Sequence, residues 1–350
     1  MFRNLIALIA ASRVVRMTLP TKGDIPVLAI SSGEKIVVTL PVNPDTSMNG
    51  TQSMFFANRS GHLVVKPLAR SETRTRDFEV IRSYSALPGA GERVWLSGWL
   101  GTVPEDFGID QYEEFSMPNG TKAWLIPGGS DWIISVHGRK ANRGECLRVA
   151  PLLNNLGFSN LIISHETDKP PAGLGIRRSN LGLTEWKEVE SAVAFAIKNG
   201  AKSVTLYGWS LGSLFIGEYL KRKSPEVQIA KVIFDSPLLD FPSTIRLQSM
   251  NAGYSPEFGA LVLEKLKSSL ILRILDLRRK EAPDLIHNLN TPCLVFYSQL
   301  DGYVSMSRID EFQSSNTNAH LEHFVGARHC RLYNQDSVRY EKAISDFLRA

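Results

Sequence analysis

Apolar and polar residues follow two different rhythms along this chain, and the change falls near Tyr112. From residue 21 to about residue 100, short β-branched apolar runs alternate with turn residues such as Asn43-Pro44-Asp45. This pattern is typical of short strands joined by turns. The predicted strands are Ile25–Ile30, Lys35–Leu40, His62–Lys66, Phe78–Ile81 and Val94–Leu96, and the polar stretch Arg70–Arg76 is interpreted as a solvated loop. We therefore expect a small β-rich extension over residues 21–105, in which no catalytic constellation is found.

From Tyr112 onward, strand-like runs alternate with helix-like segments, which favours a mostly parallel sheet covered by helices on both faces. The predicted strands are Glu113–Ser116, Lys122–Ile126, Trp132–Val136, Asn160–Ile163, Ser203–Tyr207, Lys231–Phe234, Cys293–Tyr297 and Leu321–Val325. The predicted helices are Glu145–Leu156, Thr184–Asn199, Ser213–Arg222, Arg308–Phe312 and Ser337–Leu348. A helical insertion is predicted at about residues 241–289, between the strands Lys231–Phe234 and Cys293–Tyr297. We interpret residues 106–350 as one domain that carries this insertion as a lid.

The leucine-rich and isoleucine-rich part of the lid, Leu261–Lys280, has two interpretations. It could be a mobile cap over an apolar acyl pocket, or an ordinary packed helix with basic residues near its C-terminus. The N-terminal segment 1–20 contains an apolar run, Leu5–Ala11, that is far shorter than the roughly 20 residues of a membrane span. We expect an amphipathic helix that packs on the domain or lies on a membrane surface. Cleaved export is the alternative.

Composition excludes some function classes. The net charge of +5 is mildly basic, but Lys and Arg are scattered without a basic stripe interleaved with aromatics, so nucleic-acid binding is not expected. Cys146, Cys293 and Cys330 are far apart, which suits reduced thiols in a cytoplasmic protein better than a disulfide framework. His, Cys and carboxylate residues show no metal-ligand spacing, so neither a metal nor another cofactor is predicted.

The stretch Gly208-Trp209-Ser210-Leu211-Gly212 carries the strongest chemical signal. An apolar β-branched run precedes it and a helix-forming segment follows it. A strand, a sharp G-x-S-x-G turn and a helix together expose the serine hydroxyl above the end of a sheet. The two glycines leave room where a side chain would meet the neighbouring strand or helix. Ser210 is therefore the candidate nucleophile, and the following helix directs N–H groups toward developing negative charge.

A nucleophilic serine needs a base and an acid that orients the base, in the chain order Ser, Asp, His for this arrangement. Asp301 follows the strand Cys293–Tyr297, and His329 follows the last predicted strand. Asp235 and Asp240, after the sixth strand, are the rival acids. His320, which precedes the last predicted strand, and His323, which lies within it, are the rival bases.

The oxyanion should be bound by the backbone N–H groups of Leu211 and Arg139. Arg139 belongs to the loop His137-Gly138-Arg139 after the third strand, where His137 is expected to hold the loop by a hydrogen bond. Arg139, Lys140 and Arg143 either attract an anionic acyl or phosphate group or form a solvated helix start. His165 either lines the pocket or is exposed, and Trp209 is expected to serve packing.

These motifs resemble uncharacterised serine α/β-hydrolases, in particular actinobacterial ones. The stretches that carry the resemblance are Trp132–Arg139, Gly208–Gly212, Asp235–Asp240 and Thr184-Glu185-Trp186, and it covers residues from about 105 to 350. The resemblance implies an α/β-hydrolase fold and an esterase, thioesterase or peptidase-like activity with a Ser-Asp-His triad. Two positions depart from the family pattern. Ser213 replaces a frequent glycine, and Ser164–Asp168 replaces a more usual aromatic-arginine pair.

The sequence thus predicts a serine hydrolase that cleaves a small carboxylic ester or thioester through an acyl-serine intermediate. An acyltransferase that uses the same triad and a catalytically inactive binding module are the alternatives. The expected partner is a small acyl substrate, with peripheral membrane contact through the N-terminal segment or the lid as a further option. Neither the acyl chain nor the leaving group follows from the residues.

Overall fold

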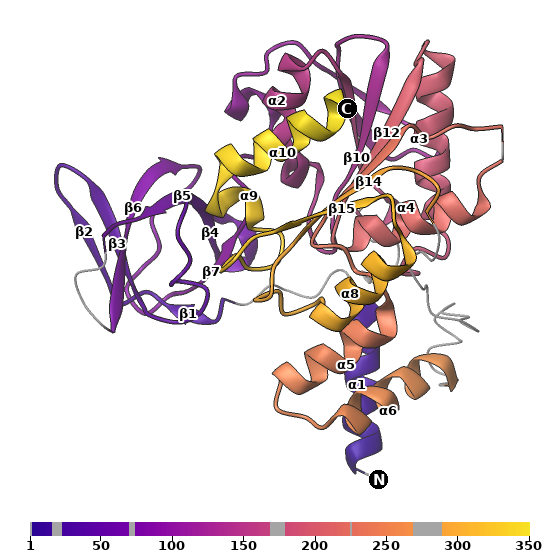
Figure 1. The fold of residues 1–350 in the computed structure, drawn as a ribbon. Helices are drawn as coiled ribbons and strands as arrows, with labels where there is room; N and C mark the ends of the chain where they lie inside the picture. Colours follow the sequence, from indigo (N-terminus) through magenta and orange to yellow (C-terminus); the bar gives the residue numbers. More distant parts are fainter. Residues whose placement is uncertain (1, 16–22, 70–73, 169–178, 225, 269–288) are drawn as a thin grey trace.

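The computed structural model describes residues 2–15, 23–69, 74–168, 179–224, 226–268 and 289–350, which form two sheets and the helices around them (Figure 1). The smaller sheet has seven strands in the order β1-β7-β4-β5-β6-β3-β2, and all its pairs are antiparallel. Its strands are β1 (Ile25–Pro26), β2 (Ala29–Ser32), β3 (Ile36–Pro41), β4 (Gln52–Phe56), β5 (Gly61–Pro67), β6 (Thr75–Ser83) and β7 (Arg93–Ser97).

Several boundaries in this sheet differ from the predicted ones. The predicted strand Ile25–Ile30 is two strands, because Pro26 has no N–H to continue the ladder, and β1 and β2 pair with different partners. Strand β4 was not predicted, since its polar start hides the apolar run. The predicted loop Arg70–Arg76 is wrong at its end: residues 70–73 lie outside the described ranges, but Arg76 lies in β6. Its buried guanidinium donates hydrogen bonds to the carbonyls of Thr46 and Ser47.

The larger sheet has eight strands in the order β15-β14-β13-β12-β10-β11-β9-β8. The pairs from β15 through to β11 are parallel, and β9 and β8 continue the sheet by antiparallel pairing. The strands are β8 (Glu113–Ser116), β9 (Lys122–Ile126), β10 (Asp131–Val136), β11 (Ser159–Ile163), β12 (Ser203–Trp209), β13 (Lys231–Asp235), β14 (Cys293–Tyr297) and β15 (Ala319–His323). A single mixed sheet therefore runs through this part of the chain.

Helices cover both faces of the larger sheet (Figure 1). Successive side chains of β10 point to opposite faces and apolar ones lie on both, so both faces must be covered. Ile134 packs with α3 (Trp186–Lys198) and α4 (Leu211–Arg222), and Ile133 packs with α2 (Ala150–Asn155) and α10 (Ser337–Arg349). The helices α8 (Met306–Ser315) and α9 (Leu332–Gln335) and the short 3-10 turns η1 (Ala57–Arg59), η2 (Pro104–Phe107), η3 (Arg143–Val149) and η4 (Glu166–Asp168) complete the described elements.

Two predictions on this part need correction. The predicted helix Glu145–Leu156 is the 3-10 helix η3 followed by α2, with Pro151 in the first turn of α2. The last strand is two residues earlier than predicted, because Phe324 turns into the core while Val325 is 61% exposed. His320 therefore lies within β15 and not before it.

The N-terminal helix α1 (Phe2–Val15) packs against α6 (Pro256–Ser268), beside α5 (Phe241–Asn251), in a lobe that projects from the part with the larger sheet (Figure 1). Ala7 and Ala11 are fully buried and belong to the same apolar cluster as Phe258. Of the predicted lid, residues 269–288, including Arg273, Arg278, Arg279 and Lys280, lie outside the described ranges. None of the described helices is long and apolar enough to cross a bilayer.

Candidate active site

The serine of the G-x-S-x-G turn has the strained backbone that this turn requires. Ser210 has φ +49°, a left-handed value that a non-glycine residue rarely adopts. A Cβ on Gly212 would lie 2.3 Å from the carbonyl oxygen of Val136, and one on Gly208 would lie 2.8 Å from Ile216. Both positions therefore exclude larger side chains, and β12 passes into α4 with Ser210 between them.

Three side chains that lie far apart in sequence form one chain of hydrogen bonds. The Nε2 atom of His329 lies 2.8 Å from Ser210 Oγ, and its Nδ1 atom lies 2.7 Å from Asp301 Oδ2. Each residue lies just beyond the C-terminal end of a strand of the larger sheet, at the same edge. All three side chains are largely buried, so their interactions act in a low-dielectric environment.

The carboxylate of Asp301 is fixed on both of its oxygens. Its Oδ1 accepts hydrogen bonds from the backbone N–H groups of Tyr303, at 2.7 Å, and Val304, at 3.2 Å. Its Oδ2 faces the imidazole of His329. Burial lowers the pKa of His329, but the charge and hydrogen bond of Asp301, followed by the charges of Asp235 and Glu145, outweigh burial and raise it. The ring is held ready to accept a proton.

The rival residues make other contacts. Asp240 caps α5, where its Oδ1 accepts a hydrogen bond from the Ser243 N–H at 2.6 Å. Asp235 is fully buried and accepts hydrogen bonds from Tyr340 Oη, at 2.7 Å, and Ser236 Oγ, at 2.9 Å. His320 contacts the carboxylate of Glu322, and the ring of His323 stacks on Tyr297. Among these candidates, the hydrogen bonds join Ser210 to His329 and Asp301.

The loop that contains Gly138 passes directly beside Ser210, and its peptide groups are held by several hydrogen bonds. A Cβ on Gly138 would lie 3.0 Å from Ser210 Cβ. The N–H of Gly138 donates to Glu145 at 2.7 Å, and its carbonyl accepts from His137 Nδ1 at 2.9 Å. In a trans peptide the N–H points opposite to the carbonyl, so the fixed Gly138 carbonyl also fixes the direction of the Arg139 N–H.

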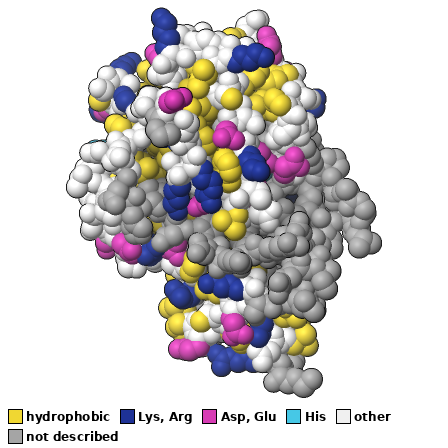
Figure 2. Space-filling model, turned by 90° about the vertical axis from the view of Figure 1, so that its right-hand side faces the viewer, with side chains coloured by type: hydrophobic (Ala, Val, Ile, Leu, Met, Phe, Trp, Pro, Cys, Tyr) yellow, Lys and Arg dark blue, Asp and Glu magenta, His cyan; other side chains and the backbone are white. Residues whose placement is uncertain are grey.

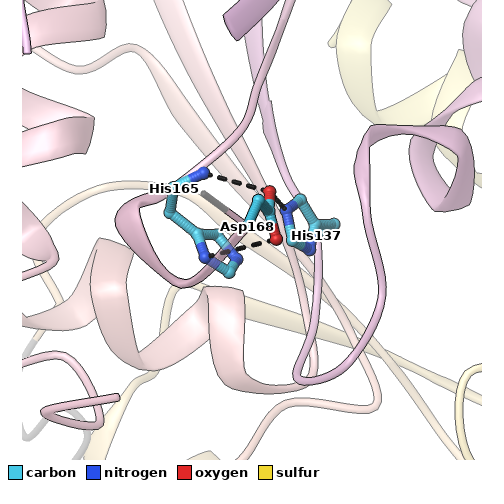
Figure 3. A group of neighbouring side chains, drawn as sticks. All are labelled: His137, His165 and Asp168. Carbon is cyan, nitrogen blue, oxygen red and sulfur yellow. Dashed lines mark hydrogen bonds and ion pairs between the residues drawn. The ribbon is translucent and has the colours of Figure 1, made fainter. Parts of the chain in front are cut away.

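His137 acts on this loop through a buried ion pair with Asp168 (Figure 3). Its Nε2 lies 2.7 Å from Asp168 Oδ2 while its Nδ1 donates to the Gly138 carbonyl. Because both partners are acceptors, the ring must carry two protons and a positive charge. The pKa of His137 agrees with this positive charge. Burial lowers this pKa, but the charge and hydrogen bond of Asp168 raise it by more. The prediction that His137 holds its loop by a hydrogen bond thus agrees with the contact observed.

The neighbouring His165 is buried and stacks on His137 with ring centroids 3.9 Å apart (Figure 3). Burial, followed by the charge of His137, lowers its pKa to about 3, so this ring is neutral. Ligand atoms of His137, His165 and Asp168 lie within 4.8 Å of one another, which is a metal-binding donor set that no sequence spacing suggested. An imidazolium has no lone pair to offer, so a metal ion would first have to displace a proton from His137.

The candidate nucleophile opens into a cavity of about 480 Å³ that both sheets line. Ser210, His329 and Tyr303 come from the part with the larger sheet. Phe55 and Trp95 come from strands of the smaller sheet, and Arg59 and Trp99 lie just outside its strands. Sequence reasoning found no chemistry in the smaller sheet, because aromatic residues at strand positions are indistinguishable from core. Trp209, in contrast, is fully buried and stacks on Tyr207, away from this cavity, as the packing interpretation predicts.

Glu145 and Asp168 were also missed as supports of the Gly138 loop. A signal existed for Glu145, which follows Asn142 by three residues, the spacing of a capping box at a helix start. No signal existed for Asp168, because its partner His137 lies 31 residues earlier in the chain, just after β10. Arg143 contacts Glu114 and the face of Trp124, so this basic residue belongs to the edge of the sheet.

No protein-family model matches the chain, and no curated protein matches it in sequence. Solved structures do match. An esterase from Pyrococcus furiosus superposes with a TM-score of 0.53 at 18% identity, covering 71% of this chain and 95% of that one. A proline iminopeptidase-related protein from Thermus thermophilus gives a TM-score of 0.50 at 17% identity, covering 68% of this chain and 98% of that one. The chain has the α/β-hydrolase fold.

At these identities the likeness concerns the fold. Each neighbour is matched over nearly its whole length, whereas part of this chain has no counterpart in it. The α/β-hydrolase fold places its functional groups at the C-terminal edge of the sheet, which is where Ser210, Asp301 and His329 lie.

Proposed function

We propose that the protein is a serine hydrolase that cleaves a carboxylic ester or thioester through an acyl-serine intermediate. The observation that carries the proposal is the hydrogen-bonded chain Ser210–His329–Asp301 beneath an open cavity. The esterase among the structural neighbours supports the same reaction class. Catalysis needs a nucleophile and base within hydrogen-bond reach and a third group that orients the base, and this arrangement meets that requirement.

In the first half of the reaction, Ser210 Oγ attacks the ester carbonyl while its proton passes to His329 Nε2. Asp301 holds the imidazole in place and stabilises the positive charge that forms on it. The tetrahedral oxyanion is bound by the N–H groups of Leu211 and Arg139, and each such donor contributes about 3 kcal/mol in comparable sites. His329 then returns the proton to the leaving alcohol or thiol as the carbonyl re-forms, which leaves an acyl-serine.

In the second half, water replaces the alcohol. His329 takes a proton from the water molecule, whose oxygen attacks the acyl carbonyl, and the same two N–H groups bind the second oxyanion. Collapse of this intermediate breaks the bond to Ser210 Oγ, which recovers its proton from His329. The products are a carboxylic acid and the free enzyme.

Hydrolysis of p-nitrophenyl esters of increasing acyl length tests the proposal, with Ser210→Ala as the matched control. We expect hydrolysis by the wild-type protein and a loss of kcat of about 10⁴-fold or more in the variant. Equal rates for wild type and Ser210→Ala across the whole series would contradict the proposal.

A further inference from the structure

The cavity above Ser210 is lined by aromatic rings and by several cationic side chains. The ring of Phe55 packs against those of Trp95 and Trp99, which form an aromatic wall with it. The ring centroid of Phe55 lies 5.6 Å from that of Trp95 and 5.5 Å from that of Trp99. Arg59 and Lys140 line the same cavity, Arg59 from the turn between β4 and β5 and Lys140 from the loop after Gly138. The two cations thus approach the candidate nucleophile from separate parts of the chain.

Lys140 is half-buried, and no ion pair joins its ammonium to an acidic group among the described residues. The charges that act on it are those of Arg139 and Arg59, both cations. Burial, followed by these two charges, lowers the pKa of Lys140 to about 8. An ammonium group in such surroundings is destabilised until an anion approaches it.

Arg59 is placed against Lys140 by a tight turn between β4 and β5. Ala57, Asn58 and Arg59 all have left-handed φ values of 43°, 53° and 75°, and such strain is seldom kept without a use. The guanidinium donates a hydrogen bond to the carbonyl of Lys140 and lies 5.4 Å from the ring centroid of Trp99. These contacts leave further N–H donors of the guanidinium for a ligand.

The arginines of the cavity other than Arg59 already have protein partners, and the carboxylate of Asp24 also lines it. The guanidinium of Arg139 donates to the carbonyls of Arg13 and Val14 at the end of α1. Arg331 and Arg328 both face Asp45, and Glu145 accepts from the Gly138 N–H. Lys140 and Arg59 are therefore the cations of this cavity that are best placed to receive a ligand.

We propose that Lys140 and Arg59 form an anion subsite, and that the natural substrate is an ester or thioester that carries a carboxylate or phosphate group. This inference rests on the proposed hydrolase function and adds the substrate class to it. The scissile carbonyl lies at Ser210, the aromatic wall contacts the apolar part, and the anion lies between the ammonium and the guanidinium. Charge-assisted hydrogen bonds to both cations fix its position.

Two esters of equal acyl length test the subsite: p-nitrophenyl hemiglutarate, which ends in a carboxylate, and p-nitrophenyl valerate, which ends in a methyl group. We measure the ratio of kcat/KM for the anionic ester to that for the neutral one. In Lys140→Gln this ratio should fall about tenfold, mainly through KM, and in Lys140→Arg it should stay near the wild-type value. Lys66→Gln, which changes an exposed lysine on β5, is the matched control and should leave the ratio unchanged.

A ratio that is the same in wild type, Lys140→Gln and Arg59→Gln would overturn the inference while Ser210-dependent hydrolysis still supported the proposed function. Activity that does not depend on Ser210 would overturn the proposed function instead. If neither ester is cleaved, calorimetric titration of Ser210→Ala with both esters tests whether the subsite binds the anion. Tighter binding of the hemiglutarate that is lost in Ser210→Ala/Lys140→Gln supports the subsite, and equal or undetectable binding of the two esters contradicts it. A p-nitrophenyl ester with a terminal phosphate, titrated in the same way, shows which anion binds more tightly.

Discussion

At the scale of single residues, the imidazole of His329 sets the acid limit of activity. A base works only in its neutral form, and the charge of Asp301 raises the pKa of His329 above its ordinary value of 6.5. Activity is therefore lost as the pH falls through a value above 6.5. The pH profile of kcat/KM for a neutral ester should show its acidic limb there. An acidic limb at or below 6.5 would contradict this assignment of the base.

The two acidic candidates near His329 should respond differently to the loss of their charge. Asp301→Asn should lower kcat by about 10⁴-fold with little loss of stability, because an amide cannot hold the imidazole as a carboxylate does. Asp235→Asn should instead lower the unfolding free energy by about 3 kcal/mol, because it removes a buried charge near Arg148 and Tyr340. Urea unfolding and ester hydrolysis of both variants check this. The reverse pattern would make Asp235 the orienting acid.

The residues of the candidate site were predictable to the extent that each has a local signal. Ser210 lies in a motif, and Asp301 and His329 each follow a run that predicts a strand. Asp168 had no such signal, because its role depends on β10 and η4 meeting in space. Arg59 and Trp99 were hidden for the same reason: the sequence of a turn or loop does not reveal which cavity its side chains line.

At the scale of elements, the ion pair between His137 and Asp168 braces the loop that carries the proposed oxyanion donor. The pKa of His137 is raised in the folded protein. The stability that this ring contributes to the fold is therefore complete below pH 6.5 and is lost as the pH rises through the folded-state pKa. The pKa of Asp168 is lowered in the folded protein. The stability that this carboxylate contributes is therefore present above pH 3.8 and is lost as the pH falls through the folded-state pKa. The pair therefore stabilises the protein most between these limits.

Asp168→Asn should test this brace. At about pH 6 the variant should lose about 3 kcal/mol of unfolding free energy, and well above the pKa of His137 the loss should become smaller. Urea unfolding at both pH values measures the two differences. Asp110→Asn, which changes an exposed carboxylate, is the control and should show no such dependence. A loss that is equal at both pH values would mean that the pair is not ionised as described.

Element boundaries show where sequence patterns stop being informative. Strands β8, β9 and β14 agree with the predicted ranges, because turn residues flank each apolar run. Strand β15 is shifted, since its alternating residues fit two registers and only pairing with β14 selects one. Helix α1 was predicted as amphipathic, but its sequence does not name the helix it packs against. That partner is α6, which lies more than 240 residues along the chain. The hydrogen bond from Arg3 to Ser255, just before α6, spans 252 residues.

At the scale of the whole molecule, buried polar contacts join the two sheets. Arg148 donates to the carbonyls of Gly98 and Cys330, and Arg331 contacts both Gln52 and Asp45. A Cβ on Gly50 would lie 1.7 Å from the carbonyl oxygen of Asn334, so the two parts also approach closely. On the face of the molecule shown in Figure 2, the described Lys and Arg side chains are scattered among acidic and apolar ones.

These contacts predict that the two sheets unfold together. Calorimetry should show one transition, with equal calorimetric and van't Hoff enthalpies. Arg331→Met should lower the unfolding free energy by about 3 kcal/mol, because it removes the buried guanidinium that contacts Asp45 and Gln52. The variant should also begin to separate the unfolding of the two sheets. Arg93→Met, which changes an exposed residue of the smaller sheet, is the control. Two resolved transitions in the wild-type protein would contradict this coupling.

The central claim, that Ser210 is an acylated nucleophile activated by His329, is tested most directly by a fluorophosphonate probe. After incubation, the protein is digested and the modified peptide is identified by mass spectrometry. One adduct is expected on Ser210: it should form rapidly in the wild-type protein, form much more slowly in His329→Ala and be absent in Ser210→Ala. An unmodified wild-type protein, or a label that persists at another residue in Ser210→Ala, would contradict it.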